Sequence, residues 1–146
     1  MNDFPQHETP LWLALLQAAG RVESRFEAAL AESGLTVSKL GMLRTLVDAG
    51  EPMPLSRLAG KLSCVKSNVT QLVDRLETEG LVVRIADPSD RRSILAGVTD
   101  LGRERFEVGR EIVRAAEEEL FGAIDSEDRQ RLASILRTLT AGGCSG

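Results

Sequence analysis

The sequence predicts a mainly α-helical fold with one small β-hairpin, and three observations support this. Apolar residues recur at steps of three and four over most of the chain, the pattern changes to short β-branched runs after Gly80, and the helical spacing returns after Val98. A chain of 146 residues has room for one compact domain with a core, but not for two comfortable ones. We therefore expect one domain with helical extensions.

The first two helices are marked by residues that favour helix ends. Pro10 favours the start of the first helix and Gly34 suits its end. The apolar stripe of this helix comprises Leu11, Leu15, Ala19, Val22, Phe26 and Leu30. Thr36 can cap a shorter second helix that ends at Gly50, ahead of two prolines. The apolar residues of the second helix are Leu40, Leu43, Leu46 and Val47.

Two short helices then flank a tight turn. The first runs from Leu55 to Leu62, the turn covers Ser63 to Val65, and the second helix continues to about Glu79, with Gly80 as its stop. The buried stripe of this second helix comprises Val65, Val69, Leu72, Val73 and Leu76. Two short helices joined in this way form the core of a helix-turn-helix.

A β-hairpin is expected directly after this motif. Leu81 to Ile85 and Ile94 to Val98 are rich in β-branched and aliphatic residues, and the loop between them, Asp87 to Arg92, is polar and charged. A hairpin with a charged tip at this place is the wing of a winged helix-turn-helix. Thr99 or Asp100 can cap the next, long helix, and Ser126 can cap a last one.

The expected organisation has a DNA-binding middle and a dimerisation arm made from both ends. Residues 1–34 supply the first helix of the arm, 35–100 the winged helix-turn-helix, 101–140 the last helices of the arm, and 141–146 a disordered tail. The first and last helices carry more apolar surface than a small winged domain needs, and a monomer would expose it. We therefore expect a homodimer.

The charge and composition exclude several other classes. The net charge is −4, yet Ser56 to Arg92 holds seven Lys and Arg against five Asp and Glu, so an acidic body carries a mildly basic middle. The polar N-terminus and the short apolar runs indicate a cytoplasmic protein without a membrane partner. One histidine, His7, and two distant cysteines predict no metal and no cofactor.

An enzyme is not expected either. The sequence lacks a glycine-rich phosphate loop and a nucleophile with a nearby histidine. Glu117, Glu118 and Glu119 point in different directions on a helix, so they indicate a solvated face.

Two adjacent surfaces are candidates for contacts with double-stranded DNA. On the polar face of the second motif helix, cations and short polar side chains can meet base edges and phosphates: Lys66, Ser67, Asn68, Thr70, Gln71 and Arg75. On the wing, Arg91 and Arg92 can enter a minor groove, and Asp90 can hold one of them in a bidentate pair. Either surface alone is typical of a solvated face, but their succession indicates DNA binding.

These segments resemble the MarR family of bacterial regulators. The resemblance lies in Leu58-Ala59, in the helix Lys66 to Glu77, in Gly80-Leu81-Val82, and most specifically in Asp87 to Arg92 followed by Val98-Thr99 and Gly102. It implies a triangular dimer that binds a palindromic operator and commonly represses. It also implies release by a small aromatic or lipophilic ligand or by an oxidant. A winged helix that binds proteins instead of DNA remains the alternative.

The effector residues are the least determined part of the sequence. A pocket between arm and winged domain could be lined by Trp12, Leu16, Met42 and Leu46, with Arg21 and Arg44 as carboxylate anchors, although such apolar stripes are often core. Cys64, next to a helix start and to two lysines, is a redox candidate as well as a plausible packing residue. At the same turn, Val65 cannot cap, so Ser63 or Ser67 must do so.

Overall fold

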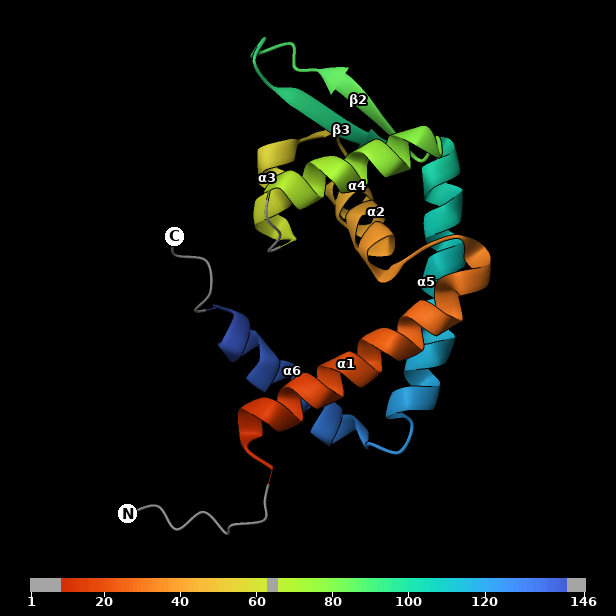
Figure 1. Cartoon of the computed structure of the whole chain (residues 1–146), viewed down its shortest axis with the longest axis vertical. Coiled ribbons are helices and arrows are strands. Elements are labelled where there is room, and N and C mark those ends of the chain that lie inside the picture. The colour runs from red at the N-terminus through yellow and green to blue at the C-terminus, as the bar shows by residue number, and fades with distance from the viewer. Residues whose placement is uncertain (1–8, 63–65, 142–146) are drawn as a thin grey trace.

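The computed structural model describes residues 9–62 and 66–141, and for Lys66 and Ser67 the backbone only (Figure 1). It confirms the mainly α-helical fold with a small antiparallel sheet. The elements in chain order are α1 (Leu11–Leu30), the 3-10 helix η1 (Ala31–Ser33), α2 (Val37–Ala49), β1 (Met53–Pro54), α3 (Leu55–Lys61), α4 (Lys66–Thr78), β2 (Val82–Ala86), β3 (Ile94–Val98), α5 (Asp100–Phe121) and α6 (Ser126–Ala141). We call α2 to β3 the winged domain and α1, α5 and α6 the arm.

Side-chain caps are seen at the starts of α2, α5 and α6. The Thr36 hydroxyl accepts a hydrogen bond from the Lys39 N–H at 3.1 Å, and the Thr99 hydroxyl accepts one from the Gly102 N–H at 3.0 Å, as predicted for the starts of α2 and α5. The cap of α6 was predicted one residue too late. Ser126 is the first helical residue, and it is the Asp125 carboxylate that accepts the Asp128 N–H, at 2.9 Å.

The sheet contains one strand more than the predicted hairpin. Its strand order is β1-β3-β2, all antiparallel, and β1 pairs Met53 with Ala96 and Pro54 with Leu95. In the sequence, Pro52 and Pro54 predicted only the end of the preceding helix and not a strand. A proline is tolerated here because β1 lies at the edge of the sheet, where a missing N–H breaks no essential ladder.

The core lies in the winged domain. Side chains of α2, α3, α4 and the sheet pack together, and Leu30 of α1 and Phe106 of α5 join them from the arm. The predicted stripe of α4 is buried at Val69, Val73 and Leu76. One face of α4 is therefore buried in the core, and the opposite face is left to solvent.

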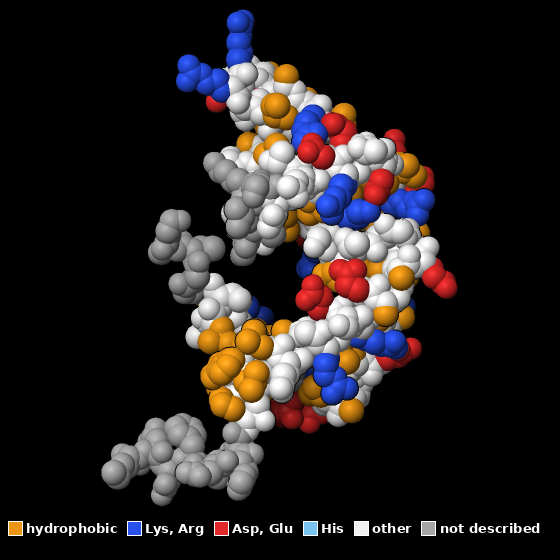
Figure 2. Space-filling view, in the orientation of Figure 1, with side chains coloured by type: hydrophobic (Ala, Val, Ile, Leu, Met, Phe, Trp, Pro, Cys, Tyr) orange, Lys and Arg blue, Asp and Glu red, His pale blue; other side chains and the backbone are white. Residues whose placement is uncertain are grey.

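The arm is built differently. In Figure 1, α5 runs from the winged domain into the arm, where it packs with α1, and Arg25 of α1 forms an ion pair with Glu119 of α5. No residue of α6 is buried. Apolar side chains gather at the N-terminal end of α1, where Figure 2 shows an orange patch and Leu11 and Trp12 are 86% and 64% exposed. The apolar excess predicted for the ends of the chain is thus exposed in the single chain.

Candidate nucleic-acid interface

The exposed face of α4 carries the polar residues that the sequence placed there. Asn68, Thr70, Gln71 and Arg75 are all exposed, on the side of the helix opposite the buried stripe. The side chains of Lys66 and Ser67, and the whole of Cys64, lie outside the described residues. Amides and hydroxyls with a cation at the end of such a face can pair with base edges in a major groove.

The wing follows α4 without a free linker. Gly80 adopts a positive φ of 76°, and the Leu81 N–H donates to the Leu76 carbonyl at 2.9 Å, so the chain reverses directly at the helix end. Strand β2 then begins at Val82, which is buried beside α4. The direction of the wing is therefore tied to the direction of α4.

Two aspartates build the tip of the wing. The Asp87 carboxylate accepts hydrogen bonds from the Ser89 hydroxyl and N–H, which lower the pKa of Asp87 below its usual value. The Asp90 carboxylate accepts the backbone N–H of Arg92 at 2.9 Å. The predicted bidentate pair between Asp90 and a wing arginine is therefore wrong: Asp90 holds the turn through the backbone N–H of Arg92.

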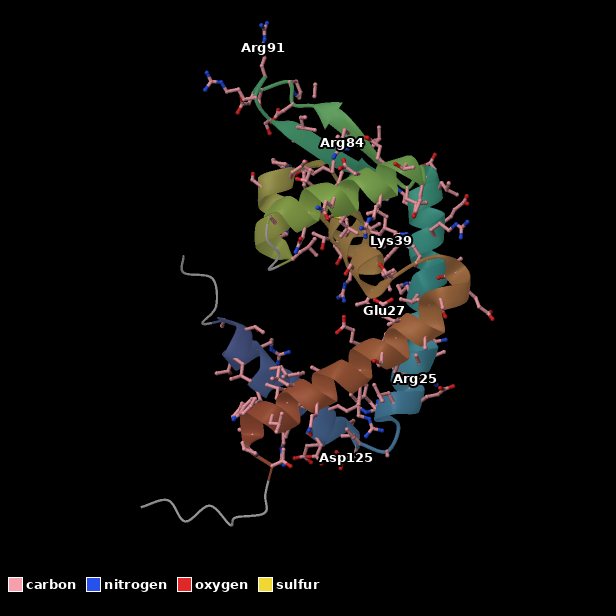
Figure 3. The ribbon with its side chains drawn as sticks, in the orientation of Figure 1. Arg25, Glu27, Lys39, Arg84, Arg91 and Asp125 are labelled. Carbon is pink, nitrogen blue, oxygen red and sulfur yellow. The ribbon has the colours of Figure 1, made fainter. Side chains whose placement is uncertain are left out.

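This turn leaves the two wing arginines exposed. Figure 3 shows Arg91 at the tip, pointing away from the body, and Figure 2 shows blue side chains projecting there. Within the described part of the chain, neither Arg91 nor Arg92 has a carboxylate partner. An unpaired guanidinium on a narrow hairpin tip is suited to a phosphate or to the floor of a minor groove.

The structure adds two cations that the sequence reading missed. Arg57 and Lys61 lie four residues apart on α3, are exposed, and have no carboxylate partner among residues 9–62 and 66–141. The first helix of a helix-turn-helix crosses the DNA backbone in known complexes. Their i, i+4 spacing places both on one side of the short helix. That spacing was the signal that could have identified them.

Arg84 was also missed. It lies in β2, and its guanidinium pairs with Asp74 and with Glu77 of α4, the latter through Nη1 to Oε1 at 2.9 Å. The hydrogen bond to Asp74 raises the pKa of Arg84 above its usual value. Asp74 and Glu77 are the carboxylates on this part of α4, and Arg84 offsets one of their two negative charges.

The predicted effector residues are not brought together. Met42 and Leu46 are buried in the core of the winged domain, whereas Trp12 and Leu16 are 64% and 61% exposed on α1. Arg21 and Arg44 line two different hollows, one along α1 and one between α2 and α5. The predicted pocket is therefore not formed within the chain, because α2 turns the face with Met42 and Leu46 inward.

A different hollow lies beside α4. It has a volume of about 420 Å³ and lies between the start of α2 and α4. Its walls are mainly apolar, from Val37, Gly41 and Leu72, and Gln71 and Arg75 stand at its polar side. The Val37 N–H at this end of α2 donates to the Glu27 carboxylate of α1 at 3.0 Å, which joins the arm to the winged domain.

Other kinds of site find no support in the described residues. No group of three or more His, Cys, Asp and Glu there is placed to hold a metal ion. None of the helices seen in residues 9–62 and 66–141 is both long and apolar enough to cross a membrane.

A helix-turn-helix followed by a hairpin defines the class of winged-helix proteins. Residues 35–94 match the family model described as MarR family. The HTH-type transcriptional regulator YkoM of Bacillus subtilis is 30% identical over 106 residues, which cover 73% of this chain and 68% of that protein. The chain therefore belongs to the MarR family of transcription regulators and not to a family of enzymes.

Solved structures agree with this assignment. The transcriptional repressor CouR, bound to a 23-mer DNA duplex, superposes with a TM-score of 0.85 at 32% identity, over 90% of this chain and 92% of that one. A MarR-family regulator from Rhodococcus sp. RHA1 reaches a TM-score of 0.83 at 27% identity, over 90% and 96%. The whole described fold, arm included, is that of this family.

Proposed function

We propose that this protein is a homodimeric, sequence-specific repressor that binds a palindromic DNA operator. The observation that carries the proposal is the succession of an exposed polar face on α4 and a wing tip whose two arginines have no carboxylate partner among the described residues. In the proposed complex, Asn68 and Gln71 read base edges in the major groove and Arg92 contacts the minor groove. The structure of the relative CouR bound to a 23-mer DNA duplex supports DNA binding by this fold.

A second copy of the chain is part of the proposal. Both α1 and α6 present large apolar side chains to solvent, among them Trp12, Ile135 and Leu139 at 59% exposure or more. Burying them between two copies would remove this apolar surface from water. The two α4 helices would then enter successive major grooves, roughly 34 Å apart.

We further propose that a small aromatic ligand relieves DNA binding. The hollow between α2 and α4 has the mainly apolar walls and few polar groups that suit such a molecule. CouR has been crystallised with p-coumaroyl-CoA, an aromatic acyl thioester, at 29% identity to this chain. Release by oxidation at Cys64 stays a prediction, since that residue is outside the described ones.

The proposal is tested by selecting fragments of the organism's own DNA with the purified chain. We expect enrichment of a palindromic site, and a binding constant that falls by about 0.9 log units per log unit of salt for each phosphate contacted. Absence of any enriched site would instead support a winged helix that binds proteins.

The effector proposal needs its own test. Gly41→Leu fills the hollow beside α2, where a Cβ on Gly41 finds its nearest neighbour, Leu62, only at 4.0 Å. We expect this variant to bind the selected operator but to lose release by a panel of aromatic acids and their CoA thioesters. A variant that is still released by the same compound would place the effector elsewhere.

A further inference from the structure

The contact between Arg84 and α4 joins the two surfaces proposed to touch DNA. The Glu77 carboxylate accepts two hydrogen bonds from Arg84, one from its backbone N–H at 3.1 Å and one from its guanidinium at 2.9 Å. Asp74 accepts a third, from the other end of the guanidinium. A planar guanidinium held at both ends and at its own backbone has little freedom to rotate. Figure 3 shows Arg84 between the hairpin and α4.

The base of the wing is anchored in the core by Val82 and Ala96, whereas its outer part has less support. The strand order β1-β3-β2 makes β2 an edge strand. Strand β1 pairs only with Leu95 and Ala96 of β3, so the outer part of the hairpin has no third strand. A two-stranded hairpin is marginally stable in water. Glu77 covers the Arg84 N–H on the open edge of β2, and Arg84 itself is 24% exposed at its side chain. The cluster therefore adds a direct link between β2 and α4 beyond the core contacts at the base of the hairpin.

The cluster also reduces the negative charge that α4 presents near the proposed DNA surface. Asp74 and Glu77 lie on the same helix as Gln71 and Arg75, where free carboxylates would repel DNA phosphates. Pairing both with one guanidinium reduces that repulsion. Because Arg84 is engaged by two acidic groups, it is not available as a phosphate contact itself.

We infer that Arg84 is a positioning residue for operator binding: with Asp74 and Glu77 it fixes the wing relative to α4, so that Arg92 reaches DNA while α4 reads the bases. This inference rests on the proposed function. It predicts that the contribution of Arg92 depends on Arg84, although the two side chains share no contact.

A double-mutant cycle on the selected operator tests this dependence. Arg92→Ala is expected to weaken binding about tenfold in the wild-type background, and less than twofold when Arg84→Gln is already present. In a binding selection, Arg84→Gln is expected to retain the base preference read by α4. In a footprint of the same operator, it is expected to lose protection of the minor groove. Equal tenfold losses in both backgrounds would overturn the inference.

Charge and folding require separate controls. Arg84→Gln with Glu77→Gln keeps the local charge of −1 but removes the clamp, so it should behave like Arg84→Gln; recovery of the dependence on Arg92 would show an electrostatic role only and overturn the inference. If Arg84→Gln does not fold, Glu77→Ala replaces it in the cycle. This variant removes the Glu77 side of the clamp and keeps the Arg84–Asp74 pair, so it is the milder change. Failure of the wild-type chain to select any DNA would overturn the proposed function as well.

Discussion

The wing and the middle of α5 use the same residue types in opposite ways. On α5, Arg110 and Arg114 each hydrogen-bond a glutamate three residues before them, at 2.7 Å and 3.1 Å. On the wing, Asp87 and Asp90 bind backbone and hydroxyl donors, and the arginines beside them stay unpaired in the described structure. A net charge of −4 therefore says little about DNA binding, because pairing decides which cations remain available.

Apolar residues show a similar contrast. The winged domain buries its large aliphatic side chains, including Leu43, Leu58 and Leu76, at 0% exposure, whereas the arm leaves Leu11 and Leu139 open. A domain with a closed core folds on itself, and a helical arm with an open stripe requires a partner surface. The following predictions test this contrast, from the largest expected effect to the smallest.

The largest effect is expected where the arm leaves the winged domain. A Cβ at Gly102 would collide with the backbone carbonyl oxygen of Leu81, and that oxygen also accepts the Thr99 N–H. We expect Gly102→Ala to lower the free energy of unfolding by roughly 2 to 4 kcal/mol, measured by denaturant titration. Gly60→Ala is the matched control, since a Cβ there meets nothing within 4 Å, and it should raise stability by up to about 1 kcal/mol. Equal effects of the two variants would contradict this packing.

The open stripe of α6 should matter for dimerisation and not for folding. Ile135 is 59% exposed in the single chain, so Ile135→Asp should leave the helical circular dichroism unchanged. A buried aspartate in a dimer interface should weaken association by about 100-fold, measured by sedimentation. Gln130→Asp, on the opposite face of α6, is the control and should leave association unchanged. A dimer that survives Ile135→Asp would remove α6 from the interface.

Free and paired arginines should differ in their effect on operator binding. Arg92→Ala retains the backbone N–H that Asp90 holds, so the turn should persist while the guanidinium is lost. We expect affinity to fall about tenfold in a gel-shift titration and the salt slope to fall by about 0.9. Arg110→Ala, which removes an arginine paired with Glu107, should change neither. Unchanged affinity for Arg92→Ala would show that the wing does not contact DNA.

The smallest effect concerns the pH dependence of the wing tip. Because the folded-state pKa of Asp87 lies below its usual value of 3.8, its contribution to the turn is present above pH 3.8 and is lost as the pH falls through that lowered pKa. The NMR amide signal of Ser89 should therefore be constant from pH 8 to pH 5 and shift with a midpoint below 3.8. A midpoint at or above 3.8 would show that the hydrogen bonds from Ser89 do not form in solution.

The helices, the caps of α2 and α5 and the hairpin could be read from spacing along the chain. Helical periodicity and the caps at Thr36 and Thr99 depend on residues three or four positions apart, and the stop at Gly80 depends on one backbone angle. The polar face of α4 follows from the same spacing, because burying Val73 and Leu76 leaves the other side of the helix to solvent. Such local relations need no knowledge of the fold.

Other features depended on the packing of distant segments. The sequence marked Met42 and Trp12 alike as apolar stripe residues, but packing placed Met42 in the core and left Trp12 on the surface. Arg84 lies ten residues from Asp74, on a strand instead of the helix, and no periodicity relates the two. Which apolar stripe is buried, and which charges meet, follows from how α2, α4 and the hairpin come together, since contacts between separate elements carry no repeat that the sequence displays.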